Sequence, residues 1–327
     1  MNEASILTLD NLSVRLPKGA DRTHALRDVS LSIASNEILC VVGESGSGKS
    51  MMANAIMRLL PNEVEIESGR MMFDGHDLCA ANAAEMREIR GAGIAMIFQE
   101  PMTALNPLRT IGDQIGEMFS VHTDLSTAEI NARVLALLAD VRIPDAKLAA
   151  RAYPHELSGG QRQRAMIAMA LALDPKLLIA DEPTTALDVT IQIQILGLLR
   201  ELCDRLDMAM LFITHDLGVI AQLVDRVAVM YGGRIVETAH VAELFGAPSH
   251  HYTRALMDCM PAHGRQRRLR PIPGQAPRPG TIAAGCVFAP RCVAARDICR
   301  EASPPRIRIS EDHEALCAFP LGRGSSL

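Results

Sequence analysis

The chain has 327 residues, a formal net charge of −5, a pI near 6.1, 48% hydrophobic residues and a mean hydropathy of +0.12. This composition excludes a disordered chain, and without a net basic charge it gives no support to a nucleic-acid-binding protein. No apolar run approaches the roughly 18 residues of a membrane span. The start, Met1-Asn2-Glu3-Ala4, lacks the basic and apolar regions of a signal peptide. We therefore expect a cytoplasmic chain, long enough for two domains.

Strands and helices alternate over the first hundred residues. The hydrophobic pattern predicts an edge strand over 6–16, then strands over 25–33, 38–42, 69–75 and 94–98, and helices over 51–60 and 83–90. This alternation indicates an α/β fold.

Helical periodicity takes over from Ile111 to Ala150, which predicts a helical subdomain within residues of about 100–165. Alternation then resumes with helices over 162–173 and 189–206 and strands over 177–180, 208–214 and 226–230. After Pro248 the composition shifts towards Pro, Gly and Arg. We therefore place one domain at 1–247 and a small C-terminal extension at 248–327.

A glycine-rich loop lies between the strand 38–42 and the helix that follows. The loop reads Gly43-Glu44-Ser45-Gly46-Ser47-Gly48-Lys49-Ser50 and matches G-x-x-x-x-G-K-[ST]. Backbone N–H groups and a helix N-terminus favour a bound phosphate, Lys49 would reach the β- and γ-phosphates, and the Ser50 hydroxyl would bind Mg²⁺. A glycine-rich turn without a ligand is the alternative, and the strand–loop–helix context favours nucleotide binding.

Two further motifs have the chemistry of an ATPase. Asp181 and Glu182 end the apolar strand 177–180, where Asp181 fits a Mg²⁺-holding acid and Glu182 a general base. Taken alone, two acids at a strand end are better explained as solvated residues, because such strand ends are common. A second helix N-terminus that could bind an anion begins with Leu157-Ser158-Gly159-Gly160-Gln161. A single nucleotide does not need two such anion-binding sites from the same subunit.

Together these motifs resemble the nucleotide-binding domain of the ABC family, over residues 6–245. The resemblance implies an α/β P-loop NTPase fold in which two subunits dimerise head to tail. The residues Ser158, Gly159, Gly160 and Gln161 of one subunit would then close over ATP and Mg²⁺ on the other. Gln99 would contact Mg²⁺ and the attacking water, Ala186-Leu187-Asp188 would form the D-loop, and His215 would act near the γ-phosphate beside the catalytic Glu182 and Gln99.

One position departs from the ABC pattern. Leu16 occupies the place where the family usually has an aromatic residue that stacks on adenine. Because an aliphatic side chain loses part of the stacking energy, we expect weaker or less base-selective nucleotide binding.

Residues 99–107, Gln-Glu-Pro-Met-Thr-Ala-Leu-Asn-Pro, resemble the ATPase subunits of peptide and nickel importers, as do segments 250–256, 272–274 and 285–292. The resemblance implies a subunit that energises di- or oligopeptide import from the cytoplasmic face of the inner membrane. Its partners would be two permease subunits, a second homologous ATPase or another copy of this chain, and indirectly an external binding protein. Nickel or glutathione import stays open. A soluble ABC ATPase acting on ribosomes or nucleic acid is disfavoured, because such proteins carry two cassettes or a long coiled-coil insertion.

Four cysteines cluster near the C-terminus, Cys286, Cys292, Cys299 and Cys317, with the spacing C-x5-C-x6-C-x17-C. In a reducing cytoplasm such clusters bind metals more often than they form disulfides. The spacing does not match the short C-x2-C of common zinc or ferredoxin sites. Three interpretations of these cysteines remain open: a [4Fe–4S] cluster, a zinc site, or reduced cysteines that only pack. The matching extension of the family suggests the [4Fe–4S] cluster. A redox-sensing role also remains open.

Overall fold

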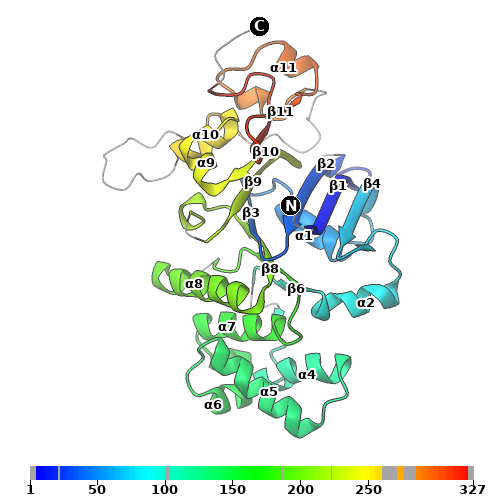
Figure 1. Cartoon of the computed structure of the whole chain (residues 1–327), viewed down its shortest axis with the longest axis vertical. Helices are drawn as coiled ribbons and strands as arrows, with labels where there is room; N and C mark the ends of the chain where they lie inside the picture. The colour runs from blue at the N-terminus through cyan, green and yellow to red at the C-terminus, as the bar shows by residue number, and fades with distance from the viewer. Residues whose placement is uncertain are drawn as a thin grey trace. The chain divides into compact units, whose positions relative to one another are not determined.

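The computed structural model describes residues 5–20, 23–100, 104–185, 187–221, 223–259, 271–275 and 285–322. The chain divides into two compact units, and Figure 1 shows its helices and strands. Unit 1 comprises Met1–Ile6, Ile33–Glu37 and Ala80–Ile213, and unit 2 comprises Leu7–Ser32, Ile38–Cys79 and Thr214–Leu327.

A four-stranded sheet contains most of the N-terminal strands. Its order is β2-β1-β4-β5, formed by β1 (Ser5–Arg15), β2 (His24–Ala34), β4 (Glu65–Phe73) and β5 (His76–Asp77). The prediction of an edge strand at residues 6–16 was wrong, because β1 lies between β2 and β4. An alternating strand buries one face whether it is internal or at an edge, so its pattern does not report its neighbours.

Unit 2 also contains a mixed set of strands around β3 (Ile38–Val42). β3 pairs in parallel with β9 (Arg226–Tyr231), which pairs antiparallel with β10 (Arg234–His240). The extension adds β11 (Arg306–Arg308) and β12 (Glu314–Leu316), and β12 pairs with β10. The helices of this unit are α1 (Lys49–Ile56), α9 (Val241–Gly246), α10 (His251–Asp258) and α11 (Ile298–Glu301).

A buried carboxylate joins the extension to β10. Glu237 is 1% exposed and accepts hydrogen bonds from the Ser249 N–H at 2.5 Å, the His250 N–H at 2.9 Å and His313 Nε2 at 2.8 Å. A buried charge is tolerated only when it is well hydrogen-bonded, and removal of one partner leaves a costly orphan. These bonds therefore fix Ser249, His250 and His313 of the extension to β10.

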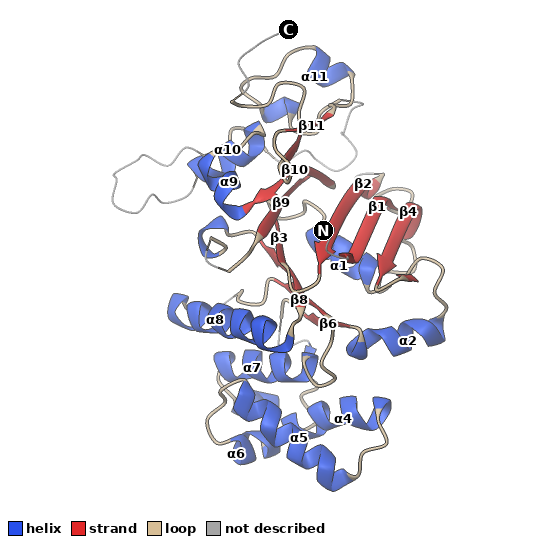
Figure 2. Ribbon diagram, in the orientation of Figure 1, coloured by secondary structure: helices blue, strands red, loops and turns tan. Residues whose placement is uncertain are grey.

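In unit 1, three parallel strands pair in the order β8-β7-β6 (Figure 2), with β6 at Ile94–Ile97, β7 at Leu177–Asp181 and β8 at Ala209–Thr214. Every residue of β7 and β8 is buried, as expected for parallel strands covered on both faces. The accompanying helices are α2 (Ala83–Ala92), α7 (Gly159–Ala170) and α8 (Val189–Leu206).

The predicted helical segment 111–150 forms α4 (Ile111–His122), α5 (Thr127–Asp140) and α6 (Ala146–Arg151). Ser126 and Glu129 make a reciprocal capping box that starts α5. Apolar side chains at helical spacing, Ile115, Phe119, Val134 and Leu138, are buried. Within the described ranges, no helix is long and apolar enough to cross a membrane.

Candidate active site

The loop from Gly43 to Ser50 connects β3 to α1 in unit 2. Two of its positions accept only glycine: a Cβ on Gly43 would lie 2.1 Å from the Met230 carbonyl oxygen, and one on Gly48 would lie 2.9 Å from that of Ala25. Gly48 also has φ of 114°, a left-handed conformation that L side chains rarely adopt. The loop can therefore form a close backbone turn at the start of a helix, the arrangement that binds phosphate.

Lys49 lies inside this turn and is only 5% exposed. Its Nζ donates to the carbonyl oxygens of Gly43 at 2.8 Å and Glu44 at 3.1 Å. The Ser47 Oγ is buried and has no hydrogen-bond partner among the described residues, while Ser50, at the helix end of the loop, is exposed. A buried ammonium group, an unsatisfied buried hydroxyl and an exposed one fit the phosphates and Mg²⁺ of a nucleotide.

Two residues far along the sequence contact the loop at Glu44. The Tyr252 hydroxyl accepts from the Glu44 N–H at 2.9 Å, and Arg291 Nη1 donates to Glu44 Oε2 at 2.7 Å. Burial raises the pKa of Tyr252, so this hydroxyl stays protonated. Neither residue has a predicted role, because no spacing signal in the sequence connects positions 208 and 247 residues away from Glu44.

The two acids of the predicted magnesium and water site end β7 in unit 1. Asp181 is 4% exposed, and Glu182 follows it with φ of 47°. The left-handed region costs a non-glycine residue about 1–2 kcal/mol. The Glu182 N–H donates to the Ile213 carbonyl at 2.9 Å, which holds the backbone in this turn. Such strain is commonly retained where a side chain must be aimed.

Gln99 and Glu182, predicted to act together, are neighbours in unit 1. Gln99 Nε2 donates to Glu182 Oε2 at 3.3 Å. The hydroxyl of Thr185 donates to the same oxygen at 3.1 Å. Thr185 was not among the predicted residues. A threonine three positions after the acid would have been the signal, since a turn brings its hydroxyl back to that side chain.

The segment from Ser158 to Gln161 forms the start of α7. Ser158 is the N-cap of α7, and its hydroxyl accepts from the Gln161 N–H at 3.4 Å. The Gln161 side-chain oxygen accepts in turn from the Ser158 N–H at 2.9 Å. The predicted helix 162–173 therefore begins earlier, at Gly159, because this capping box satisfies the first turn. Helix positions cannot be placed to the residue from periodicity alone.

The start of α7 lies beside the start of α8. A Cβ on Gly159 would lie 3.6 Å from Leu187 Cδ2, and one on Gly160 would lie 3.1 Å from Ile191 Cγ2. Asp188 is the N-cap of α8 and accepts from the Ile191 N–H at 3.0 Å. The two predicted motifs therefore lie together, although Ala186 of the second lies outside the described residues.

His215 directly follows β8 and is exposed. The Thr214 hydroxyl before it accepts from the Asp216 N–H at 3.1 Å, which fixes the turn that carries the histidine.

Leu16 is half-buried just beyond β1, and its N–H donates to the Thr23 carbonyl at 2.9 Å. A Leu16→Tyr variant should bind ATP several-fold more tightly, since base–aromatic stacking is worth about 1–3 kcal/mol. Titration with ATP and GTP would measure the change, with Leu108→Tyr at an 85% exposed position as control. Equal affinities for Leu16→Tyr and the parent chain would contradict the expectation.

Cys286, Cys292, Cys299 and Cys317 line one small cavity of about 20 Å³ together with His250 and Phe288. Burial raises the pKa of Cys286 and Cys292, and it raises that of Cys317 to about 11, so all three are thiols at neutral pH. Across the residues that the structure describes, no three His, Cys, Asp or Glu side chains are placed to hold a single metal ion.

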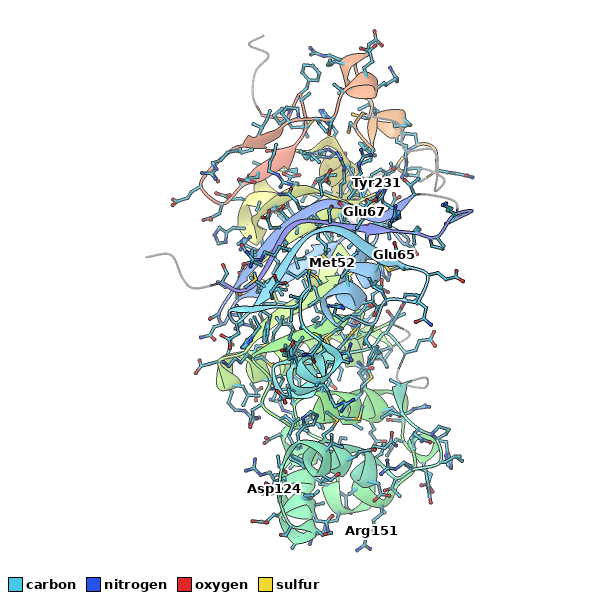
Figure 3. All side chains as sticks on the ribbon, turned by 90° about the vertical axis from the view of Figure 1, so that its right-hand side faces the viewer. Met52, Glu65, Glu67, Asp124, Arg151 and Tyr231 are labelled. Carbon is cyan, nitrogen blue, oxygen red and sulfur yellow. The ribbon has the colours of Figure 1, made fainter. Side chains whose placement is uncertain are left out.

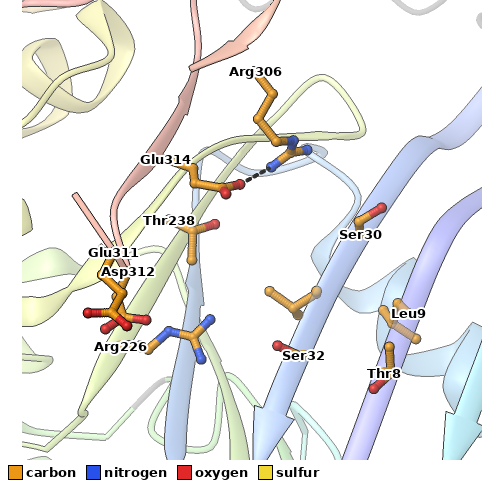
Figure 4. A pocket seen from close by; sticks show the side chains of 11 residues that line it. Thr8, Leu9, Ser30, Ser32, Arg226, Thr238, Arg306, Glu311, Asp312 and Glu314 are labelled. Atoms are coloured by element: carbon orange, nitrogen blue, oxygen red, sulfur yellow. Dashed lines mark ion pairs between the residues drawn. The ribbon is translucent and has the colours of Figure 1, made fainter. Parts of the chain in front are cut away.

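An open cavity of about 460 Å³ in unit 2 lies elsewhere (Figure 4). Its wall combines Arg226 and Arg306 with Glu311, Asp312 and Glu314, and Arg306 pairs with Glu314 at 3.7 Å. No residue of the loop 43–50 lines it. Because its arginines are surrounded by acids, it gives no excess positive charge for a phosphate.

Two family models match the chain. The model described as "ABC transporter" covers residues 26–185, and the one described as "Oligopeptide/dipeptide transporter, C-terminal region" covers residues 236–299. The first includes the loop at 43–50, Gln99, the start of α7 and both acids at the end of β7. The second includes most of β10, Tyr252 and three of the clustered cysteines.

Relatives align along nearly the whole chain. A probable peptide ABC transporter ATP-binding protein of Sinorhizobium fredii is 52% identical, over 90% of this chain and 89% of the relative. The dipeptide transport ATP-binding protein DppD of Bacillus subtilis is 44% identical, over 95% of this chain and 94% of the relative. The probable D,D-dipeptide transport ATP-binding protein DdpD of Escherichia coli is 45% identical, over 96% and 95%.

Solved structures agree with the predicted α/β P-loop fold. The dimeric, post-hydrolysis structure of the ATP-binding cassette MJ0796 bound to ADP and Pi has a TM-score of 0.64 and 29% identity, and covers 72% of this chain and 98% of that one. This chain is an ABC ATPase, and it belongs to the ATP-binding subunits of the oligopeptide/dipeptide ABC transporter family.

Proposed function

We propose that this chain hydrolyses ATP to energise the import of di- and oligopeptides. The observation that carries the proposal is the near end-to-end similarity to peptide and dipeptide transport ATP-binding proteins, which extends through the C-terminal region. A general ABC ATPase would share the loop, the acids and the start of α7, but not residues 236–299.

The predicted roles of the site residues define the proposed reaction. The loop 43–50 would bind the phosphates of ATP, and Ser50, Asp181 and Gln99 are the residues that would hold Mg²⁺. Glu182 takes a proton from the attacking water as general base, and Gln99, which already contacts its carboxylate, orients that water. His215 acts near the γ-phosphate. The start of α7, from Ser158 to Gln161, and Asp188 complete the site of a second subunit.

The proposed partners are two permease subunits and either a homologous ATPase or a second copy of this chain. An external peptide-binding protein is an indirect partner. The dimeric state of MJ0796 and the names of the relatives support this assembly. Unit 1 exposes large apolar side chains, with Leu108 at 85% and Leu148 at 68% exposure, which suits a surface that docks onto a membrane protein. The chain would then be peripheral, on the cytoplasmic face of the inner membrane.

Purification of the tagged chain from detergent-solubilised membranes tests the assembly. Two permeases and a second ATPase should remain bound, and ATP hydrolysis by the complex should rise when peptide-loaded binding protein is added. Stimulation by nickel or glutathione instead of peptide would redirect the substrate to those alternatives. Recovery of ribosomes or nucleic acid without permeases would overturn the proposal.

The cysteine cavity supports a second proposal, that Cys286, Cys292, Cys299 and Cys317 hold a [4Fe–4S] cluster. Four thiols around one small cavity supply the ligand set of such a cluster, in which each iron takes one thiolate. A cluster spreads its ligands over several iron atoms, so it does not need three side chains around one ion. When bound, it would cross-link separate stretches of the extension.

Anaerobic purification of the wild-type chain should give a brown protein with about four iron and four sulfide per chain. Cys292→Ser should lose most of this iron, whereas Cys79→Ser, which changes a cysteine outside the cavity, should keep it. A colourless wild-type protein without iron that still supports peptide uptake would contradict the cluster. Iron content is the readout here, so the result does not depend on ATPase activity.

A further inference from the structure

A side chain of the C-terminal extension reaches the phosphate-binding loop. Arg291 ends the 3-10 turn Ala289–Arg291, directly before Cys292. Its Nη1 donates to Glu44 Oε2 at 2.7 Å, and the side chains of Arg291 and Glu44 are 7% and 26% exposed. Ion pairs on open surfaces contribute little, whereas a largely buried, hydrogen-bonded pair is strongly coupled.

The other contacts of Arg291 fix its position. Its Nε donates to the Pro273 carbonyl at 3.0 Å, Nη1 also donates to the Tyr231 hydroxyl at 3.2 Å, and the guanidinium lies 5.9 Å from the Tyr231 ring centroid. Burial disfavours its charge, but the hydrogen bonds that Arg291 donates to Glu44 and Tyr231 outweigh this effect and raise the pKa of Arg291. Arg291 therefore remains a fixed cation beside the loop.

An aromatic cluster supports both partners. The rings of Tyr231, Tyr252 and Phe288 have centroids 4.5, 5.2 and 5.3 Å apart, and all three are buried. Tyr231 ends β9, Tyr252 lies on α10, and Phe288 lies further along the extension. Figure 3 labels Tyr231 together with Met52 of α1. Because Tyr252 accepts from the Glu44 N–H, the cluster reaches the loop through the backbone as well.

Glu44 is thus held at three of its groups. Tyr252 binds its N–H, Arg291 binds its carboxylate, and Lys49 donates to its carbonyl. Lys49 also donates to Gly43. Any shift of Glu44 would therefore move the ammonium group that is to meet the β- and γ-phosphates.

We propose that Arg291 is a positioning residue for ATP binding: through Glu44 it holds the loop 43–50 in its phosphate-binding shape, so the C-terminal extension sets nucleotide affinity. This inference rests on the proposed role of the loop as the ATP site. It also gives the turn between Cys286 and Cys292 a direct path to that site, because Arg291 lies within it.

Nucleotide titration and ATPase kinetics on the purified full-length chain test this inference. Arg291→Met should weaken ATP binding about tenfold and raise KM by the same factor, since a charge-assisted hydrogen bond is lost. The value of kcat should stay within about twofold, because the side chains that act on the water are unchanged. Arg291→Lys should restore part of the affinity, since it keeps one charged donor.

Arg296→Met is the matched control. Arg296 also belongs to the extension, but its guanidinium lies 4.0 Å from the Phe319 ring centroid. Its loss should leave ATP affinity within about twofold, the range expected when no ligand-positioning contact is removed. If both arginine variants weaken ATP binding equally, a general destabilisation of the extension explains the effect and the proposal is wrong.

A double-mutant cycle with Glu44→Gln separates positioning from folding. If Arg291 acts through Glu44, the double variant should bind ATP no more weakly than the weaker single variant. Additive losses would overturn the proposal. If Arg291→Met does not fold, the ATP affinities of Arg291→Lys and Glu44→Gln test the same proposal. Affinities within about twofold of wild type for both variants would reject the positioning role of Arg291.

Lys49→Ala distinguishes a failure of this inference from a failure of the ATP-site assignment. Loss of ATP binding in Lys49→Ala together with normal binding in Arg291→Met would reject only the role of Arg291. Normal binding in Lys49→Ala would reject the site itself.

Discussion

Replacement of Glu182 by Gln is expected to lower kcat for ATP hydrolysis by about 10²–10⁴-fold, the usual contribution of a general base. The amide has the same shape, so it can keep the contacts with Gln99 and Thr185 that hold this side chain. ATP affinity should therefore remain within a few-fold of the wild type. With binding retained and hydrolysis blocked, the chain should accumulate as an ATP-bound closed dimer.

Size-exclusion chromatography with and without ATP, together with phosphate release, measures both effects. Glu201→Gln is the control, because Glu201 is an exposed acid on α8 whose partner is Arg142 on the surface of the same unit. This variant should hydrolyse ATP at the wild-type rate. Substantial turnover by Glu182→Gln would remove Glu182 from the role of general base.

Lys49→Ala is expected to weaken ATP binding by at least about 100-fold, because a buried ammonium group loses its charge-assisted bonds to phosphate. Lys49 is 5% exposed and already points its Nζ at the carbonyl oxygens of the loop. No other residue named in the loop carries a positive charge that could replace it.

The measurement is calorimetric or fluorescent titration with ATP in the presence of Mg²⁺. Lys147→Ala, which removes an exposed lysine from α6 in unit 1, should bind ATP as the wild type does. Thermal melting without nucleotide shows whether the loop variant is folded. A folded Lys49→Ala protein with wild-type affinity would mean that ATP binds elsewhere.

The parts of the site that could be predicted are those with a local sequence signature. The loop 43–50 has its glycines within eight residues, the acids follow a continuous apolar strand, and the start of α7 carries a serine and two glycines. Each motif determines its own local backbone conformation, because its glycines permit tight turns and its polar side chains cap the start of a helix. Sequence order was therefore sufficient to find Lys49, Glu182 and Ser158, although their roles remain proposals.

What could not be predicted depends on contacts between distant segments. Arg291 and Tyr252 reach Glu44 only because the extension folds onto β10, and the Glu237 cluster that holds it there involves His313, 76 residues away. Apolar periodicity does not report such pairings, and it did not show that β1 is an internal strand. The same limit applies to the cysteines, whose spacing left their common cavity undetermined.

The C-terminal extension contacts the loop 43–50, which is the proposed ATP site. Residues past Pro248 contribute two strands, β11 and β12, to the same sheet as β9 and β10, and they supply two of the three groups that hold Glu44. The extension is therefore placed to affect the ATP site and to be affected by it. Two sets of contacts connect the cysteine cavity to the loop: the turn that ends in Arg291, and Phe288, which lines the cavity and packs against Tyr252.

Peptide uptake by a strain that lacks this chain tests the central claim most directly. Cells carrying the wild-type chain, the Glu182→Gln variant or no copy would be given radiolabelled di- and oligopeptides, and accumulation would be followed over time. We predict that uptake is lost in the deletion strain, is restored by the wild-type chain and is not restored by Glu182→Gln. Unchanged peptide uptake in the deletion strain, or full restoration by Glu182→Gln, would contradict the account.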